Sequence, residues 1–198
     1  LVGSEMCIRD RITILERIRL AMKAGNDNLV SYLAKTLPAD YQTMSDAIQA
    51  LQKDPLTVST FASAVGPTDF TRQATIYAFT RVARQDMENA RSLIPILVRA
   101  QKMGPEDEQA LKEIVVWRMM GSDLTSEQAR WRDAVVMNSE STALVERRVR
   151  LALSQHDRRG LNTWIARLPL EAKEKDEWQY WQADLLFEKD RKEEAEEI

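Results

Sequence analysis

The sequence is poor in the residues that build disulfides, metal centres and tight turns. Its 198 residues include one cysteine, Cys7, and one histidine, His156. A single cysteine excludes an internal disulfide, and a zinc or iron site built on thiolates or imidazoles needs more ligands than this chain carries. The six glycines and six prolines argue against a β-sandwich or barrel with many tight turns. Glycine-rich phosphate loops are missing as well, so we expect no metal and no other cofactor.

Long apolar runs and an excess of one charge are also missing. The 28 basic residues nearly balance 31 acidic ones, and no Lys/Arg block stands out that would follow a phosphate backbone. No apolar run approaches the roughly 20 residues of a membrane-spanning helix, and the first residues do not have the pattern of a signal peptide. We therefore expect neither a nucleic-acid partner nor a membrane span.

Residues 1–11 differ from the rest of the chain. The stretch Met6–Arg11 looks like a translated sequencing-library adaptor, a familiar contaminant at the ends of fragmentary gene models. We interpret residues 1–11 as a non-native leader, with a frayed natural N-terminus as the alternative. Residues 12–198 are assigned to one helical-repeat domain.

From Ile12 onward the apolar residues recur at helical spacing. Ile14, Ile18 and Met22 lie four residues apart, and the run stops at a glycine. Pro95 falls inside a later run, where we expect a kink or a break because proline removes an internal hydrogen bond. The pattern predicts roughly a dozen short helices and no strand. The predicted stops are Gly25-Asn26, Pro38, Gly66-Pro67, Gly104-Pro105, Gly121 and Pro169.

Several of the predicted helices begin at a residue that can cap them. Asp54 and Asp86 are placed to accept hydrogen bonds from free backbone amides, and Ser139 is a candidate for the same role. Thr125 and Gln128 have the spacing of a capping box, in which each side chain accepts from the other residue's amide.

Two segments of the chain resemble each other. Residues 17–38 align with residues 148–169 at a constant offset, and each reads as a helix, a polar turn and a second helix ending in Leu-Pro. Helix pairs that recur every 35–45 residues or so are typical of α-solenoids, in which each pair buries its apolar face on its neighbours. The predicted fold class is therefore all-α, an α-solenoid or superhelix of short helix pairs, with a concave face suited to a large partner or a polymer.

The same periodicity predicts core positions. Five of them are tryptophans, which could instead stack on sugar rings in a groove, but helical spacing favours packing. The predicted core residues are Leu20, Trp117, Trp131, Val149, Leu161, Trp164, Ile165, Leu168, Trp178 and Trp181.

The residues capable of chemistry do not form a recognisable constellation. His156 aligns with Gly25 in the internal repeat, which favours a turn residue over a general base, since a catalytic histidine needs partners within reach. Most carboxylates lie on predicted solvent-facing surfaces or in the acidic run at the end of the sequence. We therefore assign no catalytic, cofactor-binding or metal-binding residue.

Several long strings of this sequence resemble the soluble lytic murein transglycosylases of Gram-negative bacteria. The similarity covers essentially everything from Ile14 to Ile198. The strings that carry it are residues 15–26, 38–43, 68–73, 82–86, 158–164, 166–169, 171–178 and 180–186.

The resemblance implies a fold and a function that the pattern alone does not. Such enzymes are periplasmic and carry a long N-terminal superhelix shaped like a U. A linker domain closes the U into a ring, and a lysozyme-like catalytic domain sits on it. The enzyme cuts peptidoglycan glycan strands between N-acetylmuramic acid and N-acetylglucosamine without adding water. One glutamate acts first as acid and then as base, which leaves a 1,6-anhydro sugar.

The catalytic motifs of that family are not found here. The family's Glu-Ser pair is followed by Gly-Leu-Met-Gln and later by Ala-Tyr-Asn-Ala-Gly, whereas Glu140-Ser141 precedes Thr-Ala-Leu. The expected identity is thus a piece of the U-shaped superhelix, truncated at both ends, without the catalytic domain. Its expected partners are glycan strands, through the full-length enzyme, and the enzyme's own linker and catalytic domains. The alternative is a tetratricopeptide-like module that binds another protein.

Overall fold

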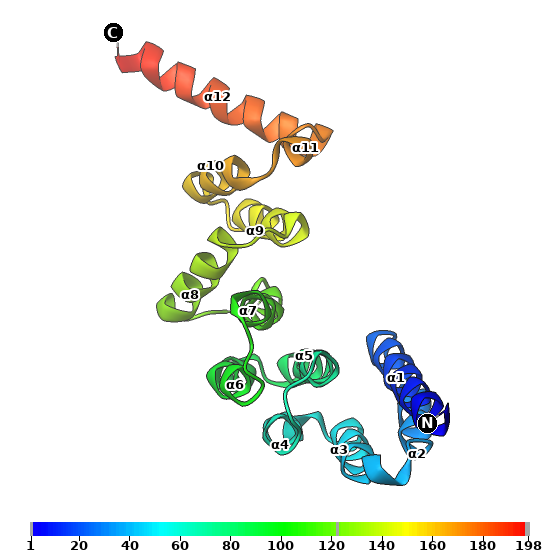
Figure 1. Ribbon diagram of the computed structural model, residues 1–198. Coiled ribbons are helices and arrows are strands. Elements are labelled where there is room, and N and C mark those ends of the chain that lie inside the picture. Colours follow the sequence, from blue (N-terminus) through cyan, green and yellow to red (C-terminus); the bar gives the residue numbers. More distant parts are fainter. Residues whose placement is uncertain (1, 122, 197–198) are drawn as a thin grey trace. The chain divides into compact units, whose positions relative to one another are not determined.

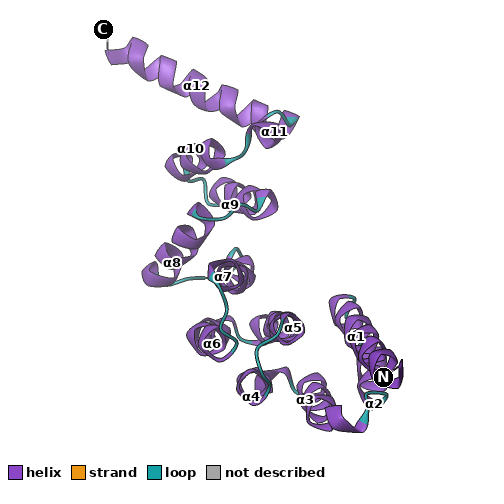
Figure 2. Ribbon diagram, viewed as in Figure 1, coloured by secondary structure: helices purple, strands orange, loops and turns teal. Residues whose placement is uncertain are grey.

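The computed structural model describes residues 2–121 and 123–196, and within them it contains helices and loops but no strand (Figures 1 and 2). The predicted all-α class is therefore confirmed. The chain divides into two compact units, residues 1–118 and 119–198. No helix in the described part has the length and apolar character needed to cross a membrane.

The first unit is a succession of helices that pack mainly on their neighbours in sequence. α1 packs on α2, α2 on α3 and α5 on α6, while α1 also reaches α5 and α4 also reaches α6. Such local packing is what an α-solenoid requires. The elements are α1 (Val2–Lys23), α2 (Asp27–Lys35), η1 (Ala39–Tyr41), α3 (Gln42–Lys53), η2 (Pro55–Thr57), α4 (Val58–Ala64), α5 (Asp69–Gln85), α6 (Met87–Ala100) and α7 (Pro105–Met119).

The second unit follows the same rule with fewer helices. α9 packs on α8 and α10, and α12 packs on α10 and α11. The elements are α8 (Ser126–Met137), α9 (Thr142–Ser154), α10 (Arg158–Arg167), α11 (Leu170–Lys173) and α12 (Asp176–Glu196).

The internal repeat reappears as one pattern of burial. The α1–α2 pair buries Ile18, Ala21, Val30, Leu33, Ala34 and Leu37, and the α9–α10 pair buries Val149, Ala152, Leu161, Trp164, Ile165 and Leu168. The members of the two sets match one to one at the offset seen in the sequence. Both pairs therefore use the same stripe of each helix to hold the other.

The turns inside the two pairs also have the same backbone geometry. Gly25 and His156 both have positive φ angles, of 71° and 53°. In each turn the next amide, from Asn26 or Asp157, bonds to a carbonyl five residues back, as in a Schellman motif. The side chains of Asn26 and Asp157 then cap the second helix. His156 is thus confirmed as a turn residue.

The predicted caps agree with the structure except at one position. Asp54 and Asp86 accept from backbone amides, and the Thr125–Gln128 capping box is present. The cap of α9 is Ser141, whose hydroxyl accepts from the Leu144 amide, so the expectation for Ser139 is wrong. The Ser139 hydroxyl instead accepts from the Ser141 amide.

The sequence predicted a kink or a break at Pro95. The helix α6 continues through this residue without a break. Pro95 lies on the exposed side of the helix, opposite the buried Ile94 and Leu97. The carbonyl that loses its partner can bond to water there, so the helix tolerates the proline.

Six of the ten expected core residues are buried: Val149, Leu161, Trp164, Ile165, Leu168 and Trp178. Trp131 and Trp181 are half-buried, and Trp117 is 37% exposed. Leu20 is 50% exposed, so its assignment to the core is wrong. The reason is its place on α1, two residues from Ile18 and therefore on nearly the opposite side of the helix.

The expected leader has helical backbone where it is described. α1 begins at Val2 and continues through residues 2–11 into the amphipathic helix. Leu1 lies outside the described residues, as does the side chain of Cys7. That residues 1–11 are non-native stays a prediction.

The matching turns at Gly25 and His156 predict that two substitutions have opposite effects on stability. An alanine at position 25 would meet no atom within 4 Å, so Gly25→Ala tests the backbone alone and should destabilise the chain by about 1 kcal/mol. His156→Gly relieves the same strain at the matching turn. It should stabilise by about 0.5 kcal/mol, after the extra freedom of glycine in the unfolded chain is subtracted. Urea denaturation followed by circular dichroism measures both, and equal signs for the two variants would contradict the matched turns.

Candidate ligand groove

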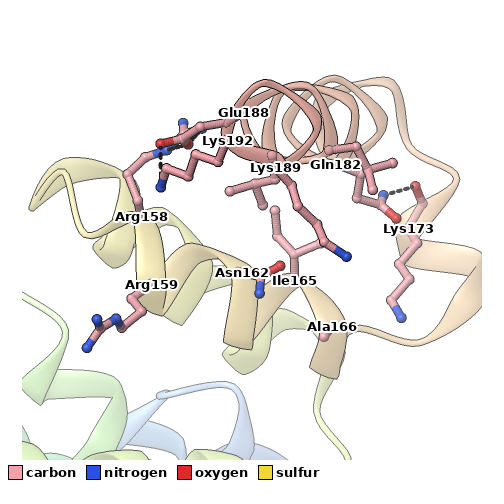
Figure 3. A pocket seen from close by; sticks show the side chains of 12 residues that line it. Arg158, Arg159, Asn162, Ile165, Ala166, Lys173, Gln182, Glu188, Lys189 and Lys192 are labelled. Carbon is pink, nitrogen blue, oxygen red and sulfur yellow. Dashed lines mark hydrogen bonds and ion pairs between the residues drawn. The ribbon is translucent and has the colours of Figure 1, made fainter. Parts of the chain in front are cut away.

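A groove with mixed apolar and charged walls lies between α10 and α12 in the second unit (Figure 3). Its volume is about 700 Å³, within the range of roughly 300–1,000 Å³ typical of ligand sites. Its aliphatic part comprises Ile165, Ala166, Leu185 and Leu186. The polar lining residues are Arg158, Arg159, Asn162, Lys173, Gln182, Glu188, Lys189 and Lys192.

Packing of α10 on α9 sets one wall of the groove. Asp157 starts α10 by accepting from the Gly160 amide. Leu161 and Trp164 are then buried, which leaves Asn162 and Ala166 on the exposed side of the helix. The groove wall is therefore formed by the exposed side of α10 together with Ile165, which also belongs to the buried core of the α9–α10 pair.

An ionic clamp holds the other wall in place. The Arg158 guanidinium donates to Asp184 at 2.7 Å and to Glu188 at 2.6 and 2.9 Å, so that α10 is tied to α12 at one end of the groove. Figure 3 shows the contact with Glu188. The hydrogen bonds raise the pKa of Arg158 and lower the pKa of Glu188. Both groups are therefore charged at neutral pH, and Arg158 is fully engaged by α12. At the other end, the Gln182 amide donates to the Lys173 carbonyl at 3.1 Å.

The remaining cations of the groove are less constrained. Within the described part of the chain, Arg159 and Lys173 form no ion pair. Lys189 lies 3.7 Å from Glu193 in an exposed pair four residues apart on α12, an arrangement that contributes only a few tenths of a kcal/mol. These three side chains can therefore meet an anionic group at little cost.

A buried ionic network supports the α8–α9–α10 region behind the groove. Asp133 accepts from Arg132 at 2.9 Å and from Arg148 at 2.8 Å, and both arginines are buried. The Arg148 guanidinium also lies over the Trp164 ring, 5.0 Å from its centroid. One half-buried carboxylate is thus shared by two buried guanidinium groups. Burial alone would raise the pKa of Asp133, but hydrogen bonds from Arg148 and Arg132 outweigh it and lower the pKa.

Glu146 is a buried carboxylate, and its surroundings can be compared with those of a catalytic acid. It is 8% exposed and accepts hydrogen bonds from Lys175 and from the Trp178 indole, the latter at 3.2 Å. Burial would raise the pKa of Glu146, but these two donors prevail and lower it. A general acid needs the opposite, a carboxyl whose pKa is raised so that it holds a proton near neutrality. Glu146 is therefore an anchor for α12 rather than a proton donor.

The other residues singled out from the sequence have structural positions. Ser141 of the Glu140-Ser141 pair caps α9, while Glu140 is exposed. Trp178 is fully buried, with the Arg150 guanidinium 5.1 Å from its ring centroid. Trp181 meets Tyr180 edge to face with centroids 5.1 Å apart. Among the described residues, no cluster of three or more His, Cys, Asp and Glu side chains could hold a metal ion.

The groove itself was not predicted from the sequence. The available signals were the Arg158-Arg159 doublet and the lysines at positions 173, 189 and 192, but these are spread over 35 residues among many acidic ones. Only the packing of α12 on α10 gathers them along one groove.

The ionic network makes a testable prediction for stability. Asp133→Asn keeps the shape of the side chain but leaves Arg132 and Arg148 buried without a counter-charge, and Nη1 of Arg148 already lacks a hydrogen-bond partner within the described residues. We expect the free energy of unfolding to fall by about 3 kcal/mol. Asp69→Asn is the control, because the Asp69 carboxylate is fully exposed beside Arg72, and it should cost less than about 0.5 kcal/mol.

The difference in the free energy of unfolding between the native sequence and Asp133→Asn should depend on pH. A carboxylate whose pKa is lowered by folding stabilises the native state above its unfolded-state pKa, about 3.9 for aspartate, and this contribution disappears as pH falls through the folded value. The gap between the native sequence and Asp133→Asn should therefore narrow below about pH 4. Urea denaturation at pH 7 and in acid measures the gap, and a gap that widens in acid would contradict the assignment.

Comparisons with known proteins give a consistent picture. No protein-family model matches this chain. The chain is 61% identical over 190 residues to the soluble lytic murein transglycosylase of Escherichia coli K12, a match that covers 96% of the chain and 30% of that protein. Identity to the Salmonella typhimurium protein of the same name is 62% over the same shares. A putative soluble lytic murein transglycosylase of Haemophilus influenzae is 32% identical over 78 residues, or 39% of this chain and 13% of its own length.

Solved structures show the same relation. The crystal structure of the 70 kDa soluble lytic transglycosylase from Escherichia coli superimposes with a TM-score of 0.89 at 61% identity, covering 94% of this chain and 30% of that one. A complex of the 70 kDa enzyme with bulgecin A matches equally well, with a TM-score of 0.89 at 61% identity over the same shares. The chain therefore spans about 30% of the length of the relatives it matches.

Proposed function

The resemblance to the soluble lytic murein transglycosylases is confirmed along 96% of the chain, and from it we propose that the chain is the scaffold portion of a peptidoglycan-cleaving enzyme. In this proposal the complete enzyme is periplasmic. It cuts glycan strands between N-acetylmuramic acid and N-acetylglucosamine and forms 1,6-anhydro-N-acetylmuramic acid. The observation that carries the proposal is the joint match of sequence and fold, at 61% identity and a TM-score of 0.89.

The scaffold role is supported by how this chain uses its polar residues. Asp133 and Glu146, the two carboxylates held in buried networks, have lowered pKa values and bind arginine, lysine or indole donors. Their role is to fix helices against each other. Within each unit the helices pack largely on their neighbours in sequence, which suits a wall that confines a polymer near a catalytic domain. Chemistry would then be the task of a lysozyme-like domain elsewhere in the enzyme, with linker and catalytic domains as the chain's partners.

The proposal predicts that the chain by itself has no turnover. Purified chain incubated with peptidoglycan sacculi should release no 1,6-anhydro-muropeptides above a buffer control, as measured by chromatography and mass spectrometry. A complete lytic transglycosylase on the same sacculi is the positive control. Release of anhydro-muropeptides by the chain would show that it carries an active site of its own.

The gene offers an independent test. The reading frame that encodes this chain should continue into a Glu-Ser pair followed by Gly-Leu-Met-Gln, the catalytic signature expected from the resemblance. Sequencing the genomic locus decides this. A frame that encodes only further helical repeats would instead favour the tetratricopeptide-like interaction module.

A further inference from the structure

The groove between α10 and α12 has cations at one end and over its middle. Lys173 lies at that end and the Lys189 side chain hangs from α12 above Ile165, whereas the Arg159 side chain points from α10 away from α12 (Figure 3). Five of the lining residues are basic, whereas the one acidic lining residue, Glu188, is held by Arg158. An extended ligand with more than one negative group is therefore complementary to the groove.

The space between these cations is aliphatic. Ile165 and Ala166 of α10 and Leu185 and Leu186 of α12 line it. Ile165 is only 3% exposed and Leu186 is 61% exposed, so a ligand would contact mainly Ala166 and the two leucines. Such a surface favours small apolar side chains over polar ones, because contact removes it from water. The groove thus combines charge recognition with an apolar strip, in a volume of about 700 Å³ that accommodates a short peptide.

We propose that this groove binds the carboxylate-bearing peptide stem of peptidoglycan. The inference rests on the proposed function, which makes peptidoglycan the polymer that the scaffold meets. Peptidoglycan stems are short peptides with several free carboxylates and with alanine methyl groups between them. Their carboxylates match Lys173 and Lys189, and their methyl groups match the aliphatic strip.

The glycan is a poorer occupant for the same groove. Sugar rings are commonly bound by stacking on aromatic side chains, yet the described lining of the groove contains none. The exposed aromatic residues of α12, Tyr180 and Phe187, are not among the lining residues. The peptide is therefore the part of the polymer that the groove is built to recognise.

The test compares ligands with and without the peptide. The probes are disaccharide-tetrapeptide muropeptides released from sacculi by a muramidase, and glycan strands stripped of peptide by an amidase. Isothermal titration calorimetry with the whole chain at low ionic strength should detect the muropeptide and not the stripped glycan. Binding should weaken as salt is added, because exposed charges are screened.

Paired variants locate the site. Lys173→Glu combined with Lys189→Glu should raise the Kd for the muropeptide by about tenfold or more, since two attractive contacts become repulsive. Lys35→Glu combined with Arg130→Glu changes the net charge equally at exposed positions away from the groove, and its Kd should stay within about twofold. The milder single variant Lys173→Gln should fall between them, and circular dichroism verifies the helical content of each.

Three results would overturn the proposal: equal binding of stripped glycan and muropeptide, equal effects of the two double variants, or no binding of either probe by the native sequence. None of these bears on the scaffold role, which the sacculus assay and the reading frame test separately. Conversely, muropeptide binding that is lost only in the groove variant would support the peptide site even if the reading frame lacked the catalytic signature.

Discussion

Short helices with a narrow apolar stripe cannot be stable alone, and the whole chain is organised by the need to cover those stripes. The cost of starting a helix is met only when packing stabilises it. In the α1–α2 and α9–α10 pairs, residues three and four apart meet the partner helix, and the turn between them is fixed by a left-handed residue and a capping side chain. The first pair then packs on α3 through α2, and the second packs on α12 through α10.

Buried polar groups add direction to this packing. In the first unit, the buried side chain of Gln101 donates to the Ala62 carbonyl at 2.7 Å and accepts from the Thr71 hydroxyl at 2.8 Å, which ties α6 to α4 and α5. In the second unit, Asp133 and Glu146 also link helices, but through charged groups: Asp133 accepts from Arg148 and Glu146 accepts from Trp178. Apolar stripes allow helices to slide or rotate, whereas buried donors and acceptors must find their partners. These contacts therefore select one arrangement among many.

The charged state of Asp133 and Glu146 also distinguishes these carboxylates from a catalytic acid. A carboxyl that donates a proton near neutral pH sits in a site that favours its neutral form, whereas the carboxylates of Asp133 and Glu146 are surrounded by cationic or N–H donors. Lys173 and Lys189, which take no part in these two carboxylates' networks, line the open groove between α10 and α12. The proposed peptide site and the networks of Asp133 and Glu146 thus use different charged residues of the same unit.

The sequence by itself determined the helical class, the internal repeat, most of the caps and the resemblance to a cell-wall enzyme family, because these depend on spacing and on contiguous strings. Even so, none of the expected stops and caps marks the start of α3 (Gln42–Lys53), although Ile48 and Leu51 are buried in it. Leu20 and Trp117 show the limit of periodicity, since a helix has several apolar positions and only its neighbours decide which are covered. The network around Asp133 and the groove between α10 and α12 exist only after packing, because their residues lie on different helices. Tertiary structure therefore decided which charges are buried, which are paired and which remain free to meet a ligand.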